Sequence, residues 1–208
     1  MIRVVLASSS PARLTTLRAA GVFPEVIVSG VDESCDDQDT AARVVTVAQR
    51  KGLAVCDVIG DAPEEDVVLI AADTMLDMGG VSYGKPHSPA IARERLHQMS
   101  GASGVLYTGH FVGVAEAGEW RCLGDVAATV VRFAVMDDAE IEAYLSTGEP
   151  LEVAGSFTID GFGGPFITGV DGDPHNVVGL SLPLLRVMLA KLGVGWTELW
   201  AATASPSG

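Results

Sequence analysis

Apolar and polar residues follow one another in blocks that predict the strands and helices of an α/β protein. The first apolar run, residues 3–7, ends in a serine-rich turn, and apolar residues then recur at helical spacing until Gly21. This order predicts a strand, a turn and a capped helix. Residues 67–72 are apolar at every position, which is typical of a central strand buried on both faces and which brings Asp73 and Thr74 to the strand's end.

The other elements follow from the same two periodicities. Helices are predicted over residues 39–55, 89–99 with Ser88 as cap, 137–146 and within 177–192, and strands over residues 25–28, 104–115, 120–133 and 166–170. The two long strands meet at a turn around residues 117–118, so we expect them to pair antiparallel and to extend the sheet. The glycine pair at residues 79–80 suggests a further hairpin.

Length and composition indicate one globular domain. The chain has 208 residues, of which 48% are hydrophobic and 19% are charged, and this is enough for one substantial core. We therefore expect a single domain over residues 1–200. Residues 201–208 are mostly small and are expected to form a disordered tail.

Other features of the sequence bear on the cellular compartment. No apolar run approaches the roughly 18 to 20 residues of a membrane span, and the first residues are typical of a strand rather than of a signal peptide. Cys35, Cys56 and Cys122 lie far apart, without the CxxC spacing of a zinc site or a redox pair, and are expected to be reduced thiols. These features predict a cytoplasmic protein with no membrane partner.

The net charge restricts the ligands that the chain can bind. A formal charge of −14 argues against a broad surface for nucleic acid polymers, because such surfaces depend on clustered lysine and arginine. A small anionic ligand is compatible with this charge if a few cations, backbone N–H groups and a divalent metal gather in one pocket. The chain has none of the GxSxG, GxxxxGK[ST] and HExxH motifs, which excludes nucleophile-elbow hydrolases, P-loop NTPases and zincins.

Four short segments offer the chemistry of such a pocket. The turn at residues 8–13 places hydroxyls, N–H groups and the Arg13 guanidinium at a helix N-terminus, which suits phosphate, although the serines alone would also cap the helix. Asp73 is placed to take a proton from water, although an aspartate at a strand end also suits a turn. Lys85 adds a cation in a glycine-containing turn. Glu33 is a candidate metal ligand, although surface acidity is the commoner role of such a residue.

The motif Thr108-Gly109-His110 suggests a catalytic histidine at first sight. Neither a nucleophile nor a set of metal ligands stands at a recognisable spacing from it. The motif instead predicts a turn that enters a strand, with His110 held by hydrogen bonds.

Taken in order, these segments resemble the Maf family of nucleoside triphosphate pyrophosphatases over nearly the whole chain. The segments that carry the resemblance are LASSSPAR at 6–13, VDE at 31–33, Lys51, AADT at 71–74, GKP at 84–86, SG at 100–101, TGH at 108–110, GEP at 148–150, AGSFTIDG at 154–161 and NVVGL at 176–180. Each segment is common on its own, whereas the ordered set is specific.

The resemblance implies an α/β fold with an elongated mixed sheet flanked by helices, in two lobes with a nucleotide-binding cleft between them. It implies a hydrolase that converts nucleoside triphosphates to monophosphates and pyrophosphate, with Mg²⁺ or Mn²⁺ as the divalent metal, and often a homodimer. The family is linked to house-cleaning of noncanonical nucleotides and to the regulation of cell division.

The resemblance also assigns roles to individual residues. Asp73 is implied to be the general base, and Glu33 and Asp73 to be metal ligands. The residues implied to bind the substrate are Ser8, Ser9, Arg13, Lys51, Thr74, Lys85 and Asp160, of which Arg13, Thr74 and Asp160 fall at positions that set base specificity. These residue types also fit the reaction independently, because attack of water at the α-phosphorus requires a base, a metal and cations on the β- and γ-phosphates.

The base that the site selects stays open at this stage. The segment GSF at 155–157 followed by Asp160 is similar to the family branch associated with 7-methyl-GTP. Ile159, in contrast, is similar to the branch that acts on dTTP and UTP, which usually has Gln in place of Asp160. Ala12 stands where many members have a second arginine, and His87 stands where aspartate is usual.

Two alternative functions also stay open. One is a nucleotide-binding regulatory protein of cell division with little turnover, against which the joint presence of Asp73, Glu33, Lys51 and Lys85 argues. The other is a phosphatase that releases inorganic phosphate from the γ-position. Its products would distinguish it from a pyrophosphatase.

Overall fold

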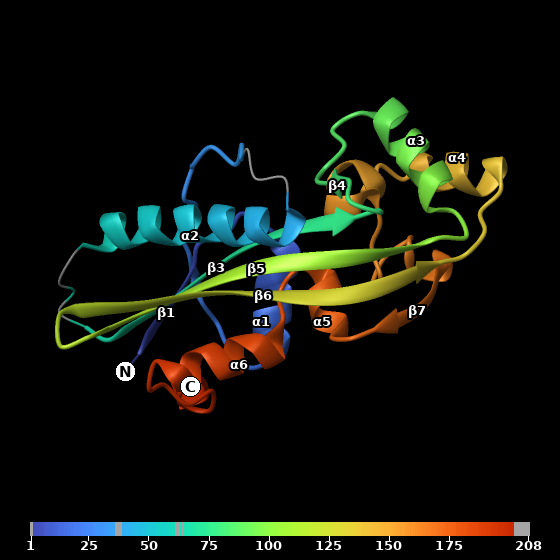
Figure 1. Ribbon diagram of the computed structural model, residues 1–208. Helices are drawn as coiled ribbons and strands as arrows, with labels where there is room; N and C mark the ends of the chain where they lie inside the picture. The colour runs from blue at the N-terminus through green and yellow to red at the C-terminus, as the bar shows by residue number, and fades with distance from the viewer. Residues whose placement is uncertain (1, 36–38, 61–62, 64, 202–208) are drawn as a thin grey trace.

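The computed structural model describes residues 2–35, 39–60, 63 and 65–201, and it shows a mixed seven-stranded sheet with helices on both faces (Figure 1). The strands are β1 (Arg3–Leu6), β2 (Glu25–Val26), β3 (Val67–Asp77), β4 (Ser82–Tyr83), β5 (Ser103–Glu116), β6 (Glu119–Phe133) and β7 (Ile167–Asp171). Their order is β2-β1-β3-β5-β6-β7, and β4 pairs with the end of β3. β1 pairs parallel with β2 and β3, and the other pairs are antiparallel. The predicted α/β fold with a mixed sheet is confirmed.

Helices cover both faces of the sheet at one end of the long strands, and further helices gather at the other end (Figure 1). They are α1 (Pro11–Ala19), α2 (Thr40–Ile59), α3 (Pro89–Met99), α4 (Asp138–Ser146), α5 (Pro174–Val178), α6 (Leu182–Lys191) and α7 (Glu198–Ala201), with short 3-10 segments over Glu149–Leu151, Ala154–Ser156 and Gly164–Phe166. Figure 1 shows α2 over one face of the long strands and α1 and α6 over the opposite face, whereas α3 and α4 gather at the other end of these strands. Two lobes therefore share one sheet.

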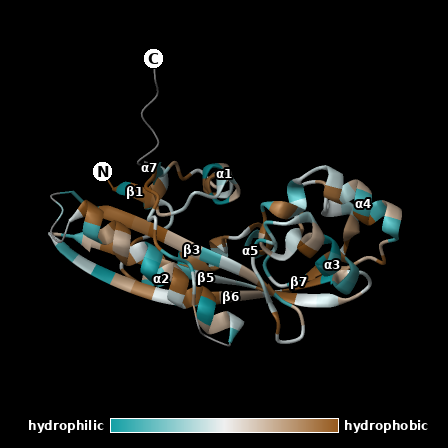
Figure 2. Ribbon diagram, turned by 90° about the horizontal axis from the view of Figure 1, so that it is seen from above, coloured by the Kyte–Doolittle hydropathy of each residue, from teal (hydrophilic) through white to brown (hydrophobic). Residues whose placement is uncertain are grey.

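The buried core divides in the same way. One apolar cluster on the first half of β3 includes Val68 and Ile70, and a second cluster includes Val67 and Leu69. Alternate residues of β3 thus face two different layers of helices, which explains why this part of the strand is apolar at every position. Figure 2 shows the hydrophobic colouring of this half of β3, which gives way to paler colours further along the strand. Two further clusters fill the other lobe.

Asp73 and Thr74 lie inside β3 rather than at its end, so the predicted end of this strand was wrong. β1 pairs with β3 only as far as Leu6 opposite Ile70, whereas β5 pairs with β3 as far as Asp77. Pairing with β5 extends β3 beyond Ile70. On the other edge of β3, β1 no longer pairs beyond this point, and polar residues are tolerated there. Asp73 therefore lines a space that opens where β1 ends.

One helix end also needs correction, and one short helix was not predicted. α2 continues to Ile59, about one turn beyond its predicted end. The helix expected within residues 177–192 is confirmed as α6. The short helix α5 before it was not predicted, and it is separate from α6 because Gly179 adopts φ 106° and ends α5, and Ser181 then caps α6. The break has a consequence for the site, since it turns the backbone carbonyl of Gly179 toward α1.

The serine turn before α1 is organised differently from a conventional cap. Ser10 and Ser88 both occupy N-cap positions, but neither side chain makes the capping hydrogen bond. Ser8 Oγ instead accepts a hydrogen bond from the Ser10 backbone N–H at 3.2 Å. Asp39 and Asp137, in contrast, cap α2 and α4 through their carboxylates. The turn that was expected to cap α1 is therefore built around Ser8.

The predicted hairpins are confirmed. Met78 N donates to Val81 O at 3.0 Å across the glycine pair, and β5 and β6 pair continuously from their shared turn. In the described part of the chain, no helix combines the length and the apolar character needed to cross a membrane. The expected disordered tail begins at Ala201, which is still part of α7, and its remainder, residues 202–208, lies outside the described residues.

Candidate active site

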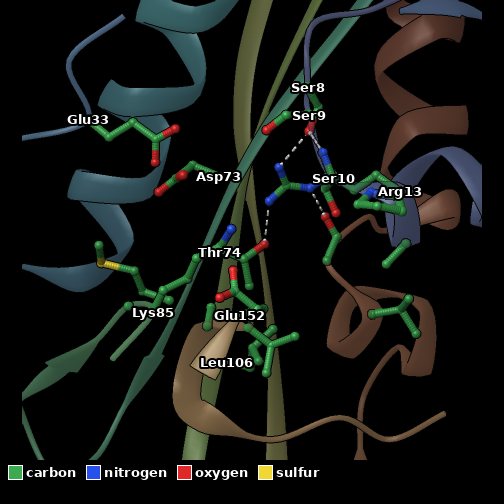
Figure 3. Close-up of a pocket in the computed structure, with 18 of the residues that line it drawn as sticks. Ser8, Ser9, Ser10, Arg13, Glu33, Asp73, Thr74, Lys85, Leu106 and Glu152 are labelled. Carbon is green, nitrogen blue, oxygen red and sulfur yellow. Dashed lines mark hydrogen bonds between the residues drawn. The ribbon is translucent and has the colours of Figure 1, made fainter. Parts of the chain in front are cut away.

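A cavity of about 960 Å³ opens where β1 leaves β3, with walls from both lobes. Segments that are far apart in the sequence form these walls: the turn after β1, the loop after β2, α2, β3, the turn after β4 and the segment after α4. All of the site residues predicted from the sequence line this cavity: Ser8, Ser9, Arg13, Glu33, Lys51, Asp73, Thr74, Lys85 and Asp160. Figure 3 labels seven of them, all except Lys51 and Asp160.

Asp73 forms a buried ion pair with Lys51 of α2. Asp73 Oδ1 lies 2.8 Å from Lys51 Nζ, and the two side chains are only 9% and 8% exposed. The same Nζ lies 2.8 Å from Oε1 of Glu33, whose side chain is 62% exposed. Figure 3 shows the two carboxylates on neighbouring elements, directed toward each other. One cation therefore holds two carboxylates together at the open end of the cavity.

Arg13, in the first turn of α1, is a buried cation whose described hydrogen-bond partners are all neutral. Its Nε donates to Gly179 O at 2.8 Å, its Nη1 to Ser8 Oγ at 3.1 Å and its Nη2 to Thr74 Oγ1 at 3.0 Å (Figure 3). Burial lowers the pKa of Arg13, and the negative charge of nearby Asp73 acts in the opposite direction. A guanidinium with five N–H donors and only neutral partners is suited to bind an anion.

Thr74 connects Arg13 to the core of the protein. Thr74 Oγ1 lies 3.0 Å from Thr108 Oγ1, which in turn donates to Asn176 O at 3.3 Å. Thr108 and Asn176 are fully buried. This chain of hydrogen bonds ties β3 and β5 to the segment after β7 and so fixes the position of the guanidinium.

Lys85 lies at the rim of the cavity, on the turn that follows β4. Its side chain is exposed. Arg95 of α3 supports this turn, because its Nη1 donates to Gly84 O at 2.7 Å and its guanidinium lies 4.8 Å from the centre of the Tyr83 ring. α3 thereby fixes the turn that carries Lys85 beside the cavity.

Glu149 organises the loop that carries Asp160. Its carboxylate accepts hydrogen bonds from Tyr144 Oη at 2.9 Å, from Thr158 Oγ1, from Phe162 N at 3.0 Å and from Gly163 N at 3.1 Å. Burial alone would raise the pKa of Glu149, but these hydrogen bonds together hold the pKa below its usual value.

We expect Glu149→Gln to destabilise the protein by about 1 to 2 kcal/mol, because an amide group replaces one acceptor oxygen and leaves partly buried donors without a partner. The measurement is the free energy of unfolding in denaturant, with Glu119→Gln at the exposed start of β6 as the matched control. Equal unfolding free energies for the two variants would show that Glu149 does not hold the loop.

Four residues with ionisable side chains also line the cavity and were not assigned a role from the sequence: Arg43, His87, Arg95 and Glu152. Arg43 is the most informative, because its Nε is buried and has no hydrogen-bond partner among the described residues. It precedes Lys51 by two helical turns, so both side chains lie on the same face of α2. A search for cations at helical spacing from Lys51 could therefore have found it.

His110 is a structural residue, as expected, although its motif lies within β5 rather than in a turn. Its Nδ1 lies 3.0 Å from Thr108 O, and its Nε2 accepts from Ser181 N at 2.9 Å. Burial, with a further contribution from the charge of Arg13, lowers the pKa of His110 to about 4. The preceding Gly109 permits α2 to pack directly on the strand, since a Cβ there would lie 2.2 Å from Val44 O.

Comparison with known proteins supports the resemblance found in the sequence. The family profile described as Maf-like protein matches residues 3–192. Three bacterial proteins named nucleoside triphosphate pyrophosphatase are similar over nearly their whole length. The protein from Cutibacterium acnes is 47% identical, and the match covers 94% of this chain and 93% of that protein. The protein from Salinispora tropica is 48% identical, with 98% of this chain and 90% of that protein covered, and the protein from Streptomyces coelicolor is 49% identical, with 96% and 95% covered. The chain therefore belongs to the Maf-like protein family.

Proposed function

We propose that this protein hydrolyses nucleoside triphosphates to nucleoside monophosphates and pyrophosphate. The observation that carries the proposal is the meeting of Asp73 and the buried Arg13 in one cavity, with Lys51 and Lys85 also on its walls. The names of the similar proteins from three bacteria support the same reaction.

In the proposed reaction, a water molecule attacks the α-phosphorus of the nucleotide. Asp73 accepts a proton from this water, a bond forms between the water oxygen and phosphorus, and the bond from phosphorus to the oxygen bridging toward the β-phosphate breaks. Pyrophosphate leaves with that oxygen and its electron pair. The reaction requires no covalent nucleophile. The cavity supplies the carboxylates and cations that it does require, beside serine and threonine hydroxyls and the imidazole of His87.

The triphosphate would lie along the cations of the cavity. Arg13 offers a guanidinium held by neutral groups, and Lys85 offers an exposed ammonium at the rim. An ammonium has three donors, so Lys51 can keep its contacts with Glu33 and Asp73 and also donate to a phosphate oxygen. In a protein of net charge −14, these local cations would be needed to offset repulsion of the anion.

A divalent metal, Mg²⁺ or Mn²⁺, fits the carboxylates of the cavity. Glu33 and Asp73 both lie 2.8 Å from the cationic nitrogen of Lys51, and this arrangement of two carboxylates around one positive charge supports a metal site, since oxygen donors suit these metals. No group of three or more metal-binding side chains is found among the described residues. Phosphate oxygens and water would therefore supply the remaining ligands of the metal. The metal would spread the charge of the phosphates when bound.

Product analysis distinguishes this proposal from its two alternatives. A panel of canonical and methylated nucleoside triphosphates is incubated with the protein and Mg²⁺ or Mn²⁺, and the products are resolved. We expect monophosphate and pyrophosphate. Diphosphate and inorganic phosphate would identify a γ-phosphatase instead, and tight binding without turnover would identify a regulatory protein of the kind suggested for cell division.

We expect Asp160→Gln to shift the preference of the enzyme toward UTP and dTTP by about tenfold, the effect of roughly one hydrogen bond. An ionised carboxylate only accepts hydrogen bonds, so Asp160 suits the N1–H and N2–H₂ edge of guanine or the N4 amine of cytosine, and the charge of 7-methylguanine adds attraction. Gln can donate to O4 and accept from N3–H, as uracil and thymine require.

The comparison uses kcat/KM for UTP, dTTP, CTP, GTP and 7-methyl-GTP, with Asp171→Gln at the exposed end of β7 as the matched control. Asp160 is an exposed residue of the cavity wall, so the substitution is not expected to disturb the fold. If the ranking of the five nucleotides stays the same, base specificity must depend on other residues, with Arg13 and Thr74 the next to replace.

We also propose that the enzyme acts on free nucleotides in the cytoplasm, with neither a nucleic acid polymer nor a membrane as partner. The strongly negative charge of the chain supports the first of these exclusions. The homodimer implied by the family stays a prediction, which light scattering of the purified protein would test.

A further inference from the structure

Two contacts fix the position of α2 on β6, one on each side of Cys122 along the strand. Trp120 Nε1 donates to Gly60 O at the end of α2, at 2.9 Å. Gly124 lies against the Gln49 side chain, since a Cβ at this glycine would be only 2.5 Å from Gln49 Nε2. Trp120, Cys122 and Gly124 stand at every second position of β6, so they lie on the same face of the sheet. Cys122 therefore faces the part of α2 between Gln49 and Gly60.

Cys56 is the residue that α2 presents to this position. It lies two turns after Gln49 and about one turn before Gly60, so all three residues share the face of the helix that meets β6. Cys122 pairs across the sheet with Gly113, which has no side chain to stand between the two sulfurs. The strand neighbours of Gly113, Phe111 and Ala115, belong to the same apolar cluster as Cys56.

The two thiols interact and are unequal. Cys56 is buried, whereas Cys122 is exposed, and the structure holds both in the reduced state. The interaction between their side chains, with burial acting in the same direction, raises the pKa of Cys56, and the same interaction lowers the pKa of Cys122. The accessible thiol is thus the one that ionises more readily, and thiolate character and access are the properties that govern reactivity.

We propose that Cys56 and Cys122 form a modification site, in which a disulfide compound of low molecular weight oxidises the pair to an intramolecular disulfide that joins α2 to β6. This site lies on the far part of α2 and is independent of the proposed hydrolysis. Transient disulfides of this kind are the ones that occur in reducing compartments, where they respond to the redox state.

The exchange proceeds in two steps. The Cys122 thiolate attacks one sulfur of the disulfide compound, which forms a mixed disulfide on Cys122 and releases one thiolate that takes up a proton. Cys56 then loses its proton and attacks Sγ of Cys122, which forms the protein disulfide and releases the second thiol. The two protein thiols are oxidised by two electrons in total, and the compound is reduced to two thiols.

The test uses the reduced full chain with oxidised glutathione as the probe, followed by intact mass and peptide mapping. We expect the wild type to lose two hydrogen atoms, to show a Cys56–Cys122 cross-linked peptide and to recover its mass on reduction. Cys56→Ser should stop at a glutathione adduct on Cys122, and Cys122→Ser should form no internal disulfide. Cys35→Ser serves as the matched control and should behave as the wild type.

Three results would overturn the proposal. The first is a wild type that accumulates the glutathione adduct on Cys122 without converting it. The second is a cross-link that involves Cys35 or that joins two molecules. The third is a wild type that remains fully reduced while the same glutathione solution oxidises a reference dithiol.

Discussion

Asp73→Asn is expected to lower turnover at saturating nucleotide by at least about a hundredfold, the low end of the loss of a general base. The amide has the shape of the carboxylate, so its oxygen can still accept the hydrogen bond from Lys51 that Asp73 accepts at 2.8 Å. It cannot take a proton from water. Affinity for a nonhydrolysable triphosphate, measured by calorimetry, should survive better than turnover because Arg13 and Lys85 are unchanged.

Asp66→Asn is the matched control for this variant. Asp66 is exposed, directly precedes β3 and does not line the cavity, so its replacement should leave turnover unchanged. If Asp73→Asn kept a turnover close to that of the wild type while nucleotide was saturating, Asp73 would not be the base. A loss shared equally by both variants would point to a general effect of aspartate replacement in this part of the chain.

Arg13→Ala is expected to weaken binding of a nonhydrolysable triphosphate by about 1.5 to 3 kcal/mol, or about 10- to 150-fold, because a charged hydrogen bond to phosphate is lost. The variant also removes the donor to Gly179 O, Ser8 Oγ and Thr74 Oγ1. Arg13→Lys separates the two effects, since it keeps the charge but cannot reproduce the planar set of donors.

Arg18→Ala is the control for the Arg13 variants, because Arg18 is an exposed residue in the last turn of the same helix and does not line the cavity. Calorimetric titration of folded protein gives the affinities, and circular dichroism checks the fold of each variant. Equal affinities of Arg13→Ala and Arg18→Ala for the triphosphate would remove Arg13 from the phosphate site.

The sequence was sufficient to predict most of the sheet. The apolar run of β3 and the long strands β5 and β6 extend over many residues, so their type, and the pairing of β5 with β6, could be read directly. The end of β3 could not be predicted from the sequence, because Asp73 and Thr74 are polar and stay in the strand only through pairing with β5. Such pairing is a tertiary effect that local periodicity does not contain.

The residues of the cavity could be predicted from the ordered motifs, but their mutual contacts could not. Lys51 was expected to bind phosphate, and the structure adds that it holds Glu33 and Asp73. Arg13 was expected at a helix N-terminus, and the structure adds that its support comes from Gly179, far along the chain. Contacts between such distant segments depend on the whole fold, so the spacing of residues in the sequence does not predict them.

The fate of the water oxygen reports most directly which phosphorus atom is attacked. The protein is incubated with a triphosphate from the panel in water enriched in the heavy oxygen isotope, and the products are analysed by mass spectrometry. Attack at the α-phosphorus predicts the label in the nucleoside monophosphate and unlabelled pyrophosphate. Label in the pyrophosphate, or release of labelled inorganic phosphate with nucleoside diphosphate, would contradict the account.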